Sequence, residues 1–455
     1  MLEECGFWKQ YSKDLRKPAG NVLARWYWLA RAALRAFAII LLARGERPSP
    51  STEHKTCDLL LVYFTRNQRN AFGPWLKNAD AAIQTASNLG ETDWHISWRQ
   101  CAILTLRYLL PIYRLLCKRA DSHETIPCLE EFVRYQAGLI LAEELFNRVS
   151  PMAVGTANDH SGISRAFIRK ARAKGMRVIY TQHASVGNGF PALDFDLSLL
   201  DGLQAYQQYL RSGPARGEIV ITGRHHIETR EARSAPSGKI VGLATNKADS
   251  LLTWHRLMRG IRAGGFSMVM RCHPAERRLI LWKLLCRLHG AKLDTGTLAG
   301  FLARIDVMVS GLSGTILDAA IRGISSLVFM PTQLKSPRME DYYGFERFGL
   351  CRRISIDDDP TPLLSAAIAA RLDPSIVGVF EAGLFLHPDE EKRKVVSLFM
   401  QQITRGTNID LASAGGYIRT FQTNGSFLSP LSYAEEIDRH GWLDTGTASS
   451  QGAAR

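Results

Sequence analysis

Four short segments of this chain place reactive or small polar side chains directly after runs of apolar residues. In the first segment, Thr156–Gly162, Asp159 and His160 follow the apolar run 151–157. An imidazole can take a proton from a hydroxyl group, and a carboxylate beside it can orient the ring. Asp and Ser are also common N-cap residues, so a plain helix cap remains open for Asp159 or Ser161, although a cap does not explain the added histidine.

The second segment ends the apolar run 176–183 on His183 and continues through Gly187 and Gly189. Glycines allow the backbone to turn sharply or to approach a ligand closely. The small residues begin at the expected end of a strand, so His183 is a candidate site residue. The alternative is a solvated histidine in an ordinary loop.

The third segment, RCHPAERR, begins at Arg271 and carries His273 after a buried strand pattern. Proline is favoured in the first turn of a helix, so Pro274 predicts a helix start at this point. An imidazole with guanidinium groups from Arg271 or Arg277 could hold a phosphate. The alternative for Arg277 and Arg278 is a solvated helix face.

The fourth segment, Val309–Gly323, combines small residues and hydroxyls at an expected strand-to-helix turn: Ser310, Ser313, Gly314 and Thr315. Backbone amides and hydroxyls at such a turn can bind anionic oxygen. A plain N-cap by Ser313 is the alternative. No GK[ST] follows and the chain has no GxGxxG, which argues against a P-loop NTPase and against a nicotinamide-dependent dehydrogenase.

These segments must be positioned by the elements around them. From about residue 56, apolar runs of strand length alternate with helix-patterned segments, which predicts parallel sheets covered on both faces. The polar segment 224–239 divides two such sets and is typical of an interdomain linker. The predicted fold class is therefore α/β, with two Rossmann-like parallel-sheet domains facing a cleft. The expected divisions are an N-terminal helical segment, two domains and a polar tail: 1–55, 56–226, 227–430 and 431–455.

The composition indicates which kinds of partner the protein could bind. The chain has 455 residues, 46% of them hydrophobic and 22% charged, with a formal net charge of +14. That charge favours an anionic partner. The basic residues are spread along the chain, and there is no basic strand motif, so a nucleic-acid partner is not expected. Eight scattered cysteines without a CxxC pair argue against zinc and disulfides and fit a reducing cytoplasm.

Two basic and apolar segments could meet a membrane. In the segment 21–45 arginines leave only 36–43 as an unbroken apolar run, which is far short of the ~20 residues that span a bilayer. An interfacial helix and a helix packed on the protein's own core both remain open. The segment 102–119 places Arg107, Arg114 and Lys118 on one helical face.

Taken in order, the four segments resemble bacterial glycosyltransferases of the GT-B fold. They are most similar to enzymes with cytidine-activated donors: sialyltransferases, Kdo-type capsule transferases and CDP-glycerol glycerophosphotransferases. The resemblance covers about residues 150–335. It implies that His273-Pro274 and the turn Ser310–Thr315 contact the donor nucleotide and its phosphate. Ser310 and Ser313 are not adjacent, unlike the serines of many sialyltransferases, so the donor stays open.

The resemblance also implies roles for carboxylates. In UDP-using GT-B enzymes a glutamate near the place of Asp318 holds the ribose hydroxyls, and Asp318 is a candidate for that role. A first-turn aspartate at a helix N-terminus is the alternative. The letters DFD at 194–196 lead into an apolar strand, so a strand role is preferred over a metal site. No metal and no cofactor are expected.

The function that follows is transfer of a sugar from a nucleotide-activated donor, of CMP or CDP type, to a glycan or glycolipid acceptor. Asp159, His160 and His183 are the candidate base residues. The expected location is cytoplasmic, at the inner face of an anionic membrane. Three alternatives remain: a CDP-glycerol-type polyol-phosphate transferase, a UDP-sugar transferase or epimerase, and a non-catalytic membrane scaffold with a degenerate fold.

Overall fold

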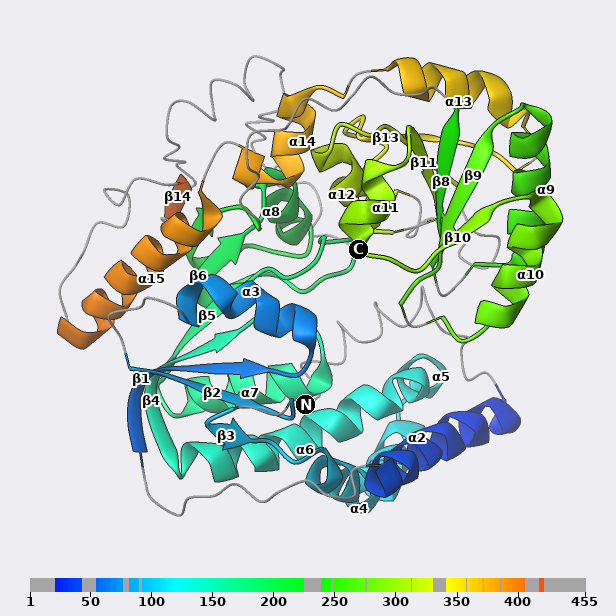
Figure 1. Cartoon of the computed structure of the whole chain (residues 1–455). Helices are drawn as coiled ribbons and strands as arrows, with labels where there is room; N and C mark the ends of the chain where they lie inside the picture. The colour runs from blue at the N-terminus through cyan, green and yellow to red at the C-terminus, as the bar shows by residue number, and fades with distance from the viewer. Residues whose placement is uncertain are drawn as a thin grey trace.

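The protein is represented by a computed structural model (Figure 1). The structure describes residues 21–42, 55–76, 82–89, 92–224, 239–246, 249–274, 276–311, 313–329, 341–356, 358–370, 372–384, 387–405 and 417–420. Most of the predicted linker 224–239 and all of the predicted polar tail 431–455 lie outside the described residues.

The first domain is built on an eight-stranded sheet in the order β14-β7-β6-β5-β4-β1-β2-β3. All strands except β14 run parallel. Central strands such as β4 and β5 are buried over most of their length, which is why their sequences are nearly continuous apolar runs. The strands are β1 (Lys55–Tyr63), β2 (Ile83–Ser87), β3 (Trp94–His95), β4 (Val149–Thr156), β5 (Arg177–Thr181), β6 (Asp194–Leu200), β7 (Arg216–Ile221) and β14 (Tyr417–Thr420).

Helices cover this sheet and extend it on one side, where α2, α4 and α6 pack together. Along the lower edge of Figure 1 these three helices form a helical layer beside the sheet. The helical elements are α2 (Val22–Leu42), α3 (Arg66–Leu76), α4 (Trp98–Cys117), α5 (Ser122–Thr125), η2 (Ile126–Cys128), α6 (Leu129–Phe146), α7 (Gly162–Ala173) and α8 (Leu203–Leu210).

The second domain contains a six-stranded, fully parallel sheet in the order β10-β9-β8-β11-β12-β13. Its strands are β8 (Ile240–Ala244), β9 (Ser267–Arg271), β10 (Lys292–Asp294), β11 (Val307–Ser310), β12 (Ser326–Val328) and β13 (Cys351–Arg353). Its helical elements are α9 (Leu251–Ala263), α10 (Leu279–His289), α11 (Leu298–Ala303), α12 (Thr315–Ile321), α13 (Pro360–Ala369), α14 (Pro374–Phe380) and η4 (Ala382–Leu384). The predicted fold class, two parallel-sheet α/β domains with an N-terminal helix, is confirmed.

The last two elements that the structure describes return to the first domain. Helix α15 (Pro388–Arg405) packs Val395 and Phe399 into the core that contains Leu59 and Leu61 of β1. Strand β14 then pairs antiparallel with β7. Figure 1 shows α15, in orange, beside the first sheet. The range 227–430 assigned to the second domain therefore includes a helix that packs on the first domain and a strand that belongs to the first sheet.

The helix expected to begin at Pro274 begins later. The Glu276 amide donates to the His273 carbonyl at 2.9 Å and closes a turn. The Glu276 carboxylate then accepts from the amides of Arg277 and Arg278, at 2.8 Å each. These bonds hold the backbone in a turn, so α10 starts at Leu279 and Pro274 precedes it by several residues.

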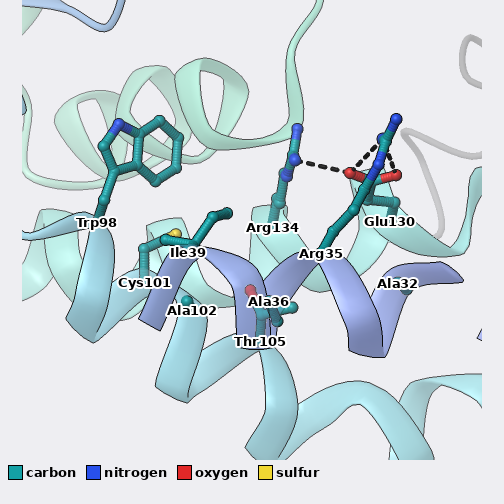
Figure 2. Close-up of a pocket in the computed structure, with 10 residues that line it drawn as sticks. All are labelled: Ala32, Arg35, Ala36, Ile39, Trp98, Cys101, Ala102, Thr105, Glu130 and Arg134. Atoms are coloured by element: carbon teal, nitrogen blue, oxygen red, sulfur yellow. Dashed lines mark hydrogen bonds and ion pairs between the residues drawn. The ribbon is translucent and has the colours of Figure 1, made fainter. Parts of the chain in front are cut away.

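A buried carboxylate of α6 is one of the groups that fix helix α2 to the domain. Glu130 of α6 accepts hydrogen bonds from Arg35 at 2.7 and 2.8 Å and from Arg134 at 2.6 Å. Figure 2 shows these side chains at one end of a pocket between α2, α4 and α6. Burial favours the neutral acid, but the arginines outweigh burial and lower the pKa of Glu130. The carboxylate therefore stays charged and holds α2 in place.

The two faces of α2 differ sharply. Trp28, Ala32 and Ala36 are buried against the domain. The opposite face is apolar but exposed, and it includes Leu23 at 80% and Leu34 at 69% exposure. The expectation that this helix packs on the protein's own core is thus met by one face of α2 only. None of the helices that the structure describes is long and apolar enough to cross a membrane.

A buried group of charges joins the two domains. Arg224, at the end of the first domain, donates to Asp318 of α12 at 3.0 Å. Its backbone amide donates to Glu381, the residue after α14, at 2.7 Å. Asp201 after β6 and Lys392 of α15 are also buried and interact electrostatically with Arg224 and Glu381. The junction therefore depends on charges from both domains and from the returning helix.

Asp201 makes this junction sensitive to pH. Burial, with a further contribution from Glu381, raises the pKa of Asp201 from 3.8 to about 7, against the opposing effects of Arg224 and Lys392. The folded protein then holds a proton that the unfolded chain releases. Such a group stabilises the fold fully below about pH 4, and its contribution is lost as the pH rises toward 7.

We expect the melting temperature of the wild type to fall more steeply than that of Asp201→Asn between about pH 5 and pH 8. The amide cannot release a proton, so the variant lacks this part of the pH dependence. Thermal unfolding in a buffer series measures both curves. Asp358→Asn, at an exposed carboxylate of the second domain, is the control and should follow the wild type. Parallel curves for Asp201→Asn and the wild type would contradict the expectation.

Candidate active site

The first candidate residues meet at the carboxyl edge of the first sheet. Asp159 and His160 follow β4, and His183 follows β5. These strands are parallel neighbours, with Thr156 opposite Tyr180 in the register. Carboxyl ends of adjacent parallel strands lie at one edge of the sheet, which brings the two loops together.

Asp159 holds the ring of His160. The Asp159 Oδ1 and His160 Nδ1 atoms are 2.8 Å apart, and Tyr209 of α8 donates its hydroxyl to Asp159 Oδ2, also at 2.8 Å. The aspartate side chain is only 1% exposed. Side chains of adjacent residues often point apart, but those of Asp159 and His160 point toward each other.

The turn before α7 also shows which residue caps this helix, Asp159 or Ser161. Ser161 is the N-cap of α7, and its hydroxyl accepts from the Ser164 amide. The Asn158 side chain accepts from the amides of His160 and Ser161 at 3.1 and 2.8 Å. Capping therefore falls to Ser161 and Asn158, and the Asp159 carboxylate remains bonded to His160 and Tyr209.

Electrostatics keep Asp159 ionised. Burial alone would raise the pKa of this carboxyl, but hydrogen bonds from His160 and Tyr209 outweigh burial, so the pKa lies below its usual value. Burial, followed by the charge of Asp159, raises the pKa of Tyr209 and Tyr180 well above 10. An ionised carboxylate only accepts hydrogen bonds, so Nδ1 of His160 must donate. In the neutral ring the basic lone pair is then on Nε2.

His183 has a different environment. Burial, with a further contribution from His160, lowers its pKa from 6.5 to about 4, so its imidazole is neutral near pH 7. Its Nδ1 is buried without a hydrogen-bond partner in the structure. A ring of such low basicity is a weak proton acceptor at neutral pH and is better suited to hold a substrate group.

In the second domain the candidates lie at the carboxyl ends of three adjacent strands. His273 follows β9, Thr245 follows β8 and Ser313 follows β11. The Thr245 hydroxyl accepts from the His273 amide at 3.2 Å. The hydroxyls of Ser313 and Thr315 are 2.9 Å apart, and Gly314 is the N-cap of α12. These side chains share one edge of the second sheet.

Three predicted donor-side residues have other partners. The hydroxyl of Ser310 is fully buried and donates to the Ala244 carbonyl at 2.9 Å. Arg271 donates to Asp294 at 2.5 Å and to the Gly296 carbonyl at 2.6 Å. Asp318 is ion-paired with Arg224.

These bonds give all three residues structural roles. Ser310 bridges neighbouring strands, Arg271 fixes the edge strand β10, and Asp318 belongs to the domain junction. The expectation that they bind the donor gains no support from this geometry. His273, Pro274, Ser313, Gly314 and Thr315 remain as donor-side candidates.

The loops of the two domains approach each other directly. A Cβ atom added to Gly314 would lie 3.6 Å from the hydroxyl of Ser185, in the loop that follows β5. A Cβ on Gly187 would lie 2.2 Å from the Tyr342 ring of the second domain, so a larger residue at that position would force the ring to move. The Asn188 amide donates to the Tyr342 carbonyl at 2.9 Å. The loop that begins at His183 thus meets the serine turn across the domains.

Sequence reasoning missed the aromatic residues around His160. The Phe190 ring lies 5.0 Å from the His160 ring, and Tyr209 lies 6.2 Å from Phe190, as measured between centroids. Tyr209 sits on the buried face of α8, where a tyrosine resembles any core aromatic. The sequence held no signal that would have distinguished it.

The acidic letters at 194–196 have the strand role expected of them. Asp194 pairs with Arg172 and Arg216, and Asp196 pairs with Arg177. Across the described parts of the chain, no three His, Cys, Asp or Glu side chains converge as metal ligands.

Comparisons with known proteins give fold-level likenesses. No family model and no curated protein matches the chain. Among solved structures, the UDP complex of S. aureus MnaA is 11% identical, with a TM-score of 0.48, and covers 78% of this chain and 98% of its own. The calicheamicin glycosyltransferase CalG4 is 12% identical, with a TM-score of 0.47, and the match covers 80% and 96%. MurG of Acinetobacter baumannii is 10% identical, with a TM-score of 0.42 and coverage of 76% and 99%. Likenesses at this level do not assign an activity.

We expect neutral His160 to carry its proton on Nδ1, and Asp159→Asn to reverse this. The new amide can donate to Nδ1, which moves the ring proton to Nε2. Nitrogen-15 NMR of labelled histidine distinguishes the two tautomers. In Tyr209→Phe, which leaves the aspartate in place, the Nδ1–H tautomer should persist. An Nε2–H tautomer in the wild type would contradict the pairing.

Proposed function

We propose that this protein is a glycosyltransferase that uses a nucleotide-activated sugar and a hydroxyl acceptor. The observation that carries the proposal is the buried, ionised Asp159 that orients His160 at the sheet edge of the first domain. The loop beside this pair, at Ser185, meets the Ser313–Thr315 turn of the second domain. The proposal places a proton acceptor and a group of hydroxyls on the two sides of one interdomain space, as a two-substrate reaction requires, and the contact at Ser185 supports it.

In the proposed reaction His160 acts as the general base. The acceptor oxygen forms a bond to the anomeric carbon, and Nε2 of His160 takes the hydroxyl proton. The bond between that carbon and the nucleotide's phosphate oxygen breaks, and its electron pair leaves with the phosphate. Asp159 stabilises the imidazolium that forms, because its carboxylate is already ionised and hydrogen-bonded to Nδ1.

The second domain would bind the donor. His273, Ser313 and Thr315 offer an imidazole and two hydroxyls at the carboxyl ends of β9 and β11. Such donors can stabilise the charge that develops on the departing phosphate. The proposed chemistry is the same for a cytidine and a uridine donor, so the identity of the base is a separate question. A CMP or CDP donor and a UDP donor are therefore both outcomes of the test below.

The partners and burial of four described carboxylates support the proposal of sugar transfer over epimerisation of a UDP-sugar. Asp159 is bonded to His160 and Tyr209, and Asp318 is ion-paired with Arg224. Asp201 and Glu381 are buried in the domain junction. An epimerase needs acidic groups that exchange protons with the sugar itself, and these four carboxylates already have structural partners or are buried.

We further propose that α2 and α4 bind an anionic membrane surface, which would place the enzyme at the inner face of a bilayer with a glycan or glycolipid acceptor. The exposed face of α2 carries Trp26, Tyr27, Leu34 and Phe37. On α4, Arg107 and Arg114 are exposed beside Ile103 and Leu110, and so is the C-cap residue Lys118. Aromatic and aliphatic side chains flanked by cations are typical of helices that lie in the interface.

A nucleotide panel tests the transferase proposal. A nucleotide at ~100 times its dissociation constant should stabilise the native protein by about 2.7 kcal/mol, measured as a thermal shift with CMP, CDP, UDP and GDP. We expect a response to a cytidine or uridine nucleotide that is lost in His273→Ala. In His160→Ala the shift should persist, while turnover of the matching nucleotide sugar falls about 10²- to 10⁴-fold. No response to any nucleotide, or unchanged turnover in His160→Ala, would contradict the proposal.

The α2 contact is tested with Leu34→Ser combined with Phe37→Ser. Both side chains are more than half exposed, so the variant should fold normally. Binding to vesicles that contain anionic lipid, measured by co-sedimentation, should weaken on the order of tenfold because apolar area is lost from the contact. Met152→Ser, at an exposed apolar residue of β4, is the control. Equal binding by the variant and the control would refute a lipid role for α2.

A further inference from the structure

A second exposed surface, on the other domain, carries apolar and basic side chains together. Helix α10 buries Trp282, Leu285 and Cys286. Its opposite face exposes Ile280 at 77%, Leu284 at 54% and Leu288 at 60%. These three residues are spaced four apart and form a continuous stripe, whereas exposed apolar residues on most surfaces are scattered singly.

Helix α9 supplies the charge beside this stripe. The two helices are in contact: His289 Nε2 lies 3.0 Å from His255 Nδ1, and Arg262 donates to the Leu288 carbonyl at 3.1 Å. Arg256 and Arg259 of α9 and Lys283 of α10 are exposed. We name the stripe Ile280, Leu284 and Leu288 with these three cations the α9–α10 surface.

All charge on the two helices is positive. Neither α9 nor α10 contains an aspartate or a glutamate. Basic residues near a helix C-terminus are explained by the helix dipole, which accounts for Arg262 and Arg287. Arg256 and Lys283 lie in mid-helix, where the dipole gives no such reason.

The pKa of His289, which lies next to His255, is also affected by the positive charge on α9. Burial lowers the pKa of His289, and His255, Arg262 and Arg259 lower it further. The described residues of α9 that act on His289 are thus another imidazole and two guanidiniums, and α9 itself has no carboxylate. Positive charge in this density calls for an anionic partner.

We propose that the α9–α10 surface binds an anionic lipid bilayer, as a second membrane contact on the second domain. Leucine and isoleucine side chains enter the boundary of the acyl chains, and the cations meet lipid phosphates. Figure 1 shows α9 and α10 at the right-hand edge of the molecule, the side on which the amino-terminal end of α2 also lies. The inference rests on the proposed membrane location and not on the transferase chemistry.

Two other partners fit the surface less well. A second copy of the chain, packed face to face, would bring the cations of one copy near the cations of the other, and like charges repel. A nucleic acid would match the cations, but its contacts are mainly polar and would leave the aliphatic stripe of α10 without a partner. A lipid surface satisfies both kinds of side chain at once.

The test compares the binding of full-length variants to sedimenting vesicles. One set of vesicles contains equal parts of phosphatidylglycerol and phosphatidylcholine, and the other contains phosphatidylcholine alone. The basic variant is Arg256→Gln with Arg259→Gln, and the apolar variant is Ile280→Ser with Leu284→Ser. The charge-matched control is Arg352→Gln with Lys394→Gln, two exposed positions away from α9 and α10.

We expect the wild type and the control to bind the anionic vesicles and to bind neutral vesicles far more weakly. The basic variant should bind the anionic vesicles on the order of tenfold more weakly, and the difference should shrink at high salt. The apolar variant should weaken by a similar factor. Both variants should keep the nucleotide-induced thermal shift of the wild type, which separates this contact from donor binding.

Several results would overturn the proposal. It is wrong if the basic and apolar variants bind anionic vesicles as tightly as the control. It is also wrong if neutral vesicles bind the wild type equally well, because the cations would then have no role. A concentration-dependent oligomer that the α10 variant dissolves, without a change in vesicle binding, would assign the surface to contacts between copies. Loss of vesicle binding in the α2 variant alone would leave only the first contact.

Discussion

A carboxylate remains ionised inside a protein only when hydrogen-bond donors replace the water that it has lost, and Asp159 is under this constraint. Its donors come from two places: the adjacent His160 and Tyr209 of α8. The hydroxyl of Tyr209 lies 2.8 Å from that of Tyr180, on β5. The charge at the candidate site therefore holds β5, α8 and the loop after β4 in one arrangement. A shift of any of these elements would leave a buried charge with fewer donors.

The sequence predicted the two sheets and the strand ends at which the candidate residues lie. Continuous apolar runs such as 151–157 identify buried parallel strands, and reactive side chains immediately after them stand out. The same reasoning could not distinguish Ser310 from Ser313. Both are small hydroxyl residues at one strand end, and only the pairing of β11 with β8 turns Ser310 toward the Ala244 carbonyl. Likewise, Pro274 is compatible with a helix start until Glu276 binds the amides of Arg277 and Arg278 and sets the start at Leu279.

Long-range polar contacts were not predictable for a related reason. Asp201, Arg224, Glu381 and Lys392 lie in four separate segments, and each alone resembles an ordinary surface charge. Only the return of α15 to the first sheet buries Lys392 beside the others. The apolar stripe of α15 predicts that the helix packs on something, but an apolar face does not specify which sheet receives it. The two domains are thus joined by buried charged groups that come together only in the folded chain.

The domain junction and the proposed membrane contacts would both affect the orientation of the two domains relative to each other. Glu130 holds α2 on the first domain through Arg31 and Arg35 of that helix. Helices α9 and α10 pack on the second sheet through Trp254 and Trp282. Each proposed contact is therefore rigidly attached to its own domain. If the two domains turn relative to each other about the junction near Arg224, a bilayer bound by one contact would leave that rotation free. A bilayer bound by both would restrain that rotation, and with it the distance between His160 and the Ser313 turn. Membrane binding through both domains would in this way favour one width of the space in which donor and acceptor must meet.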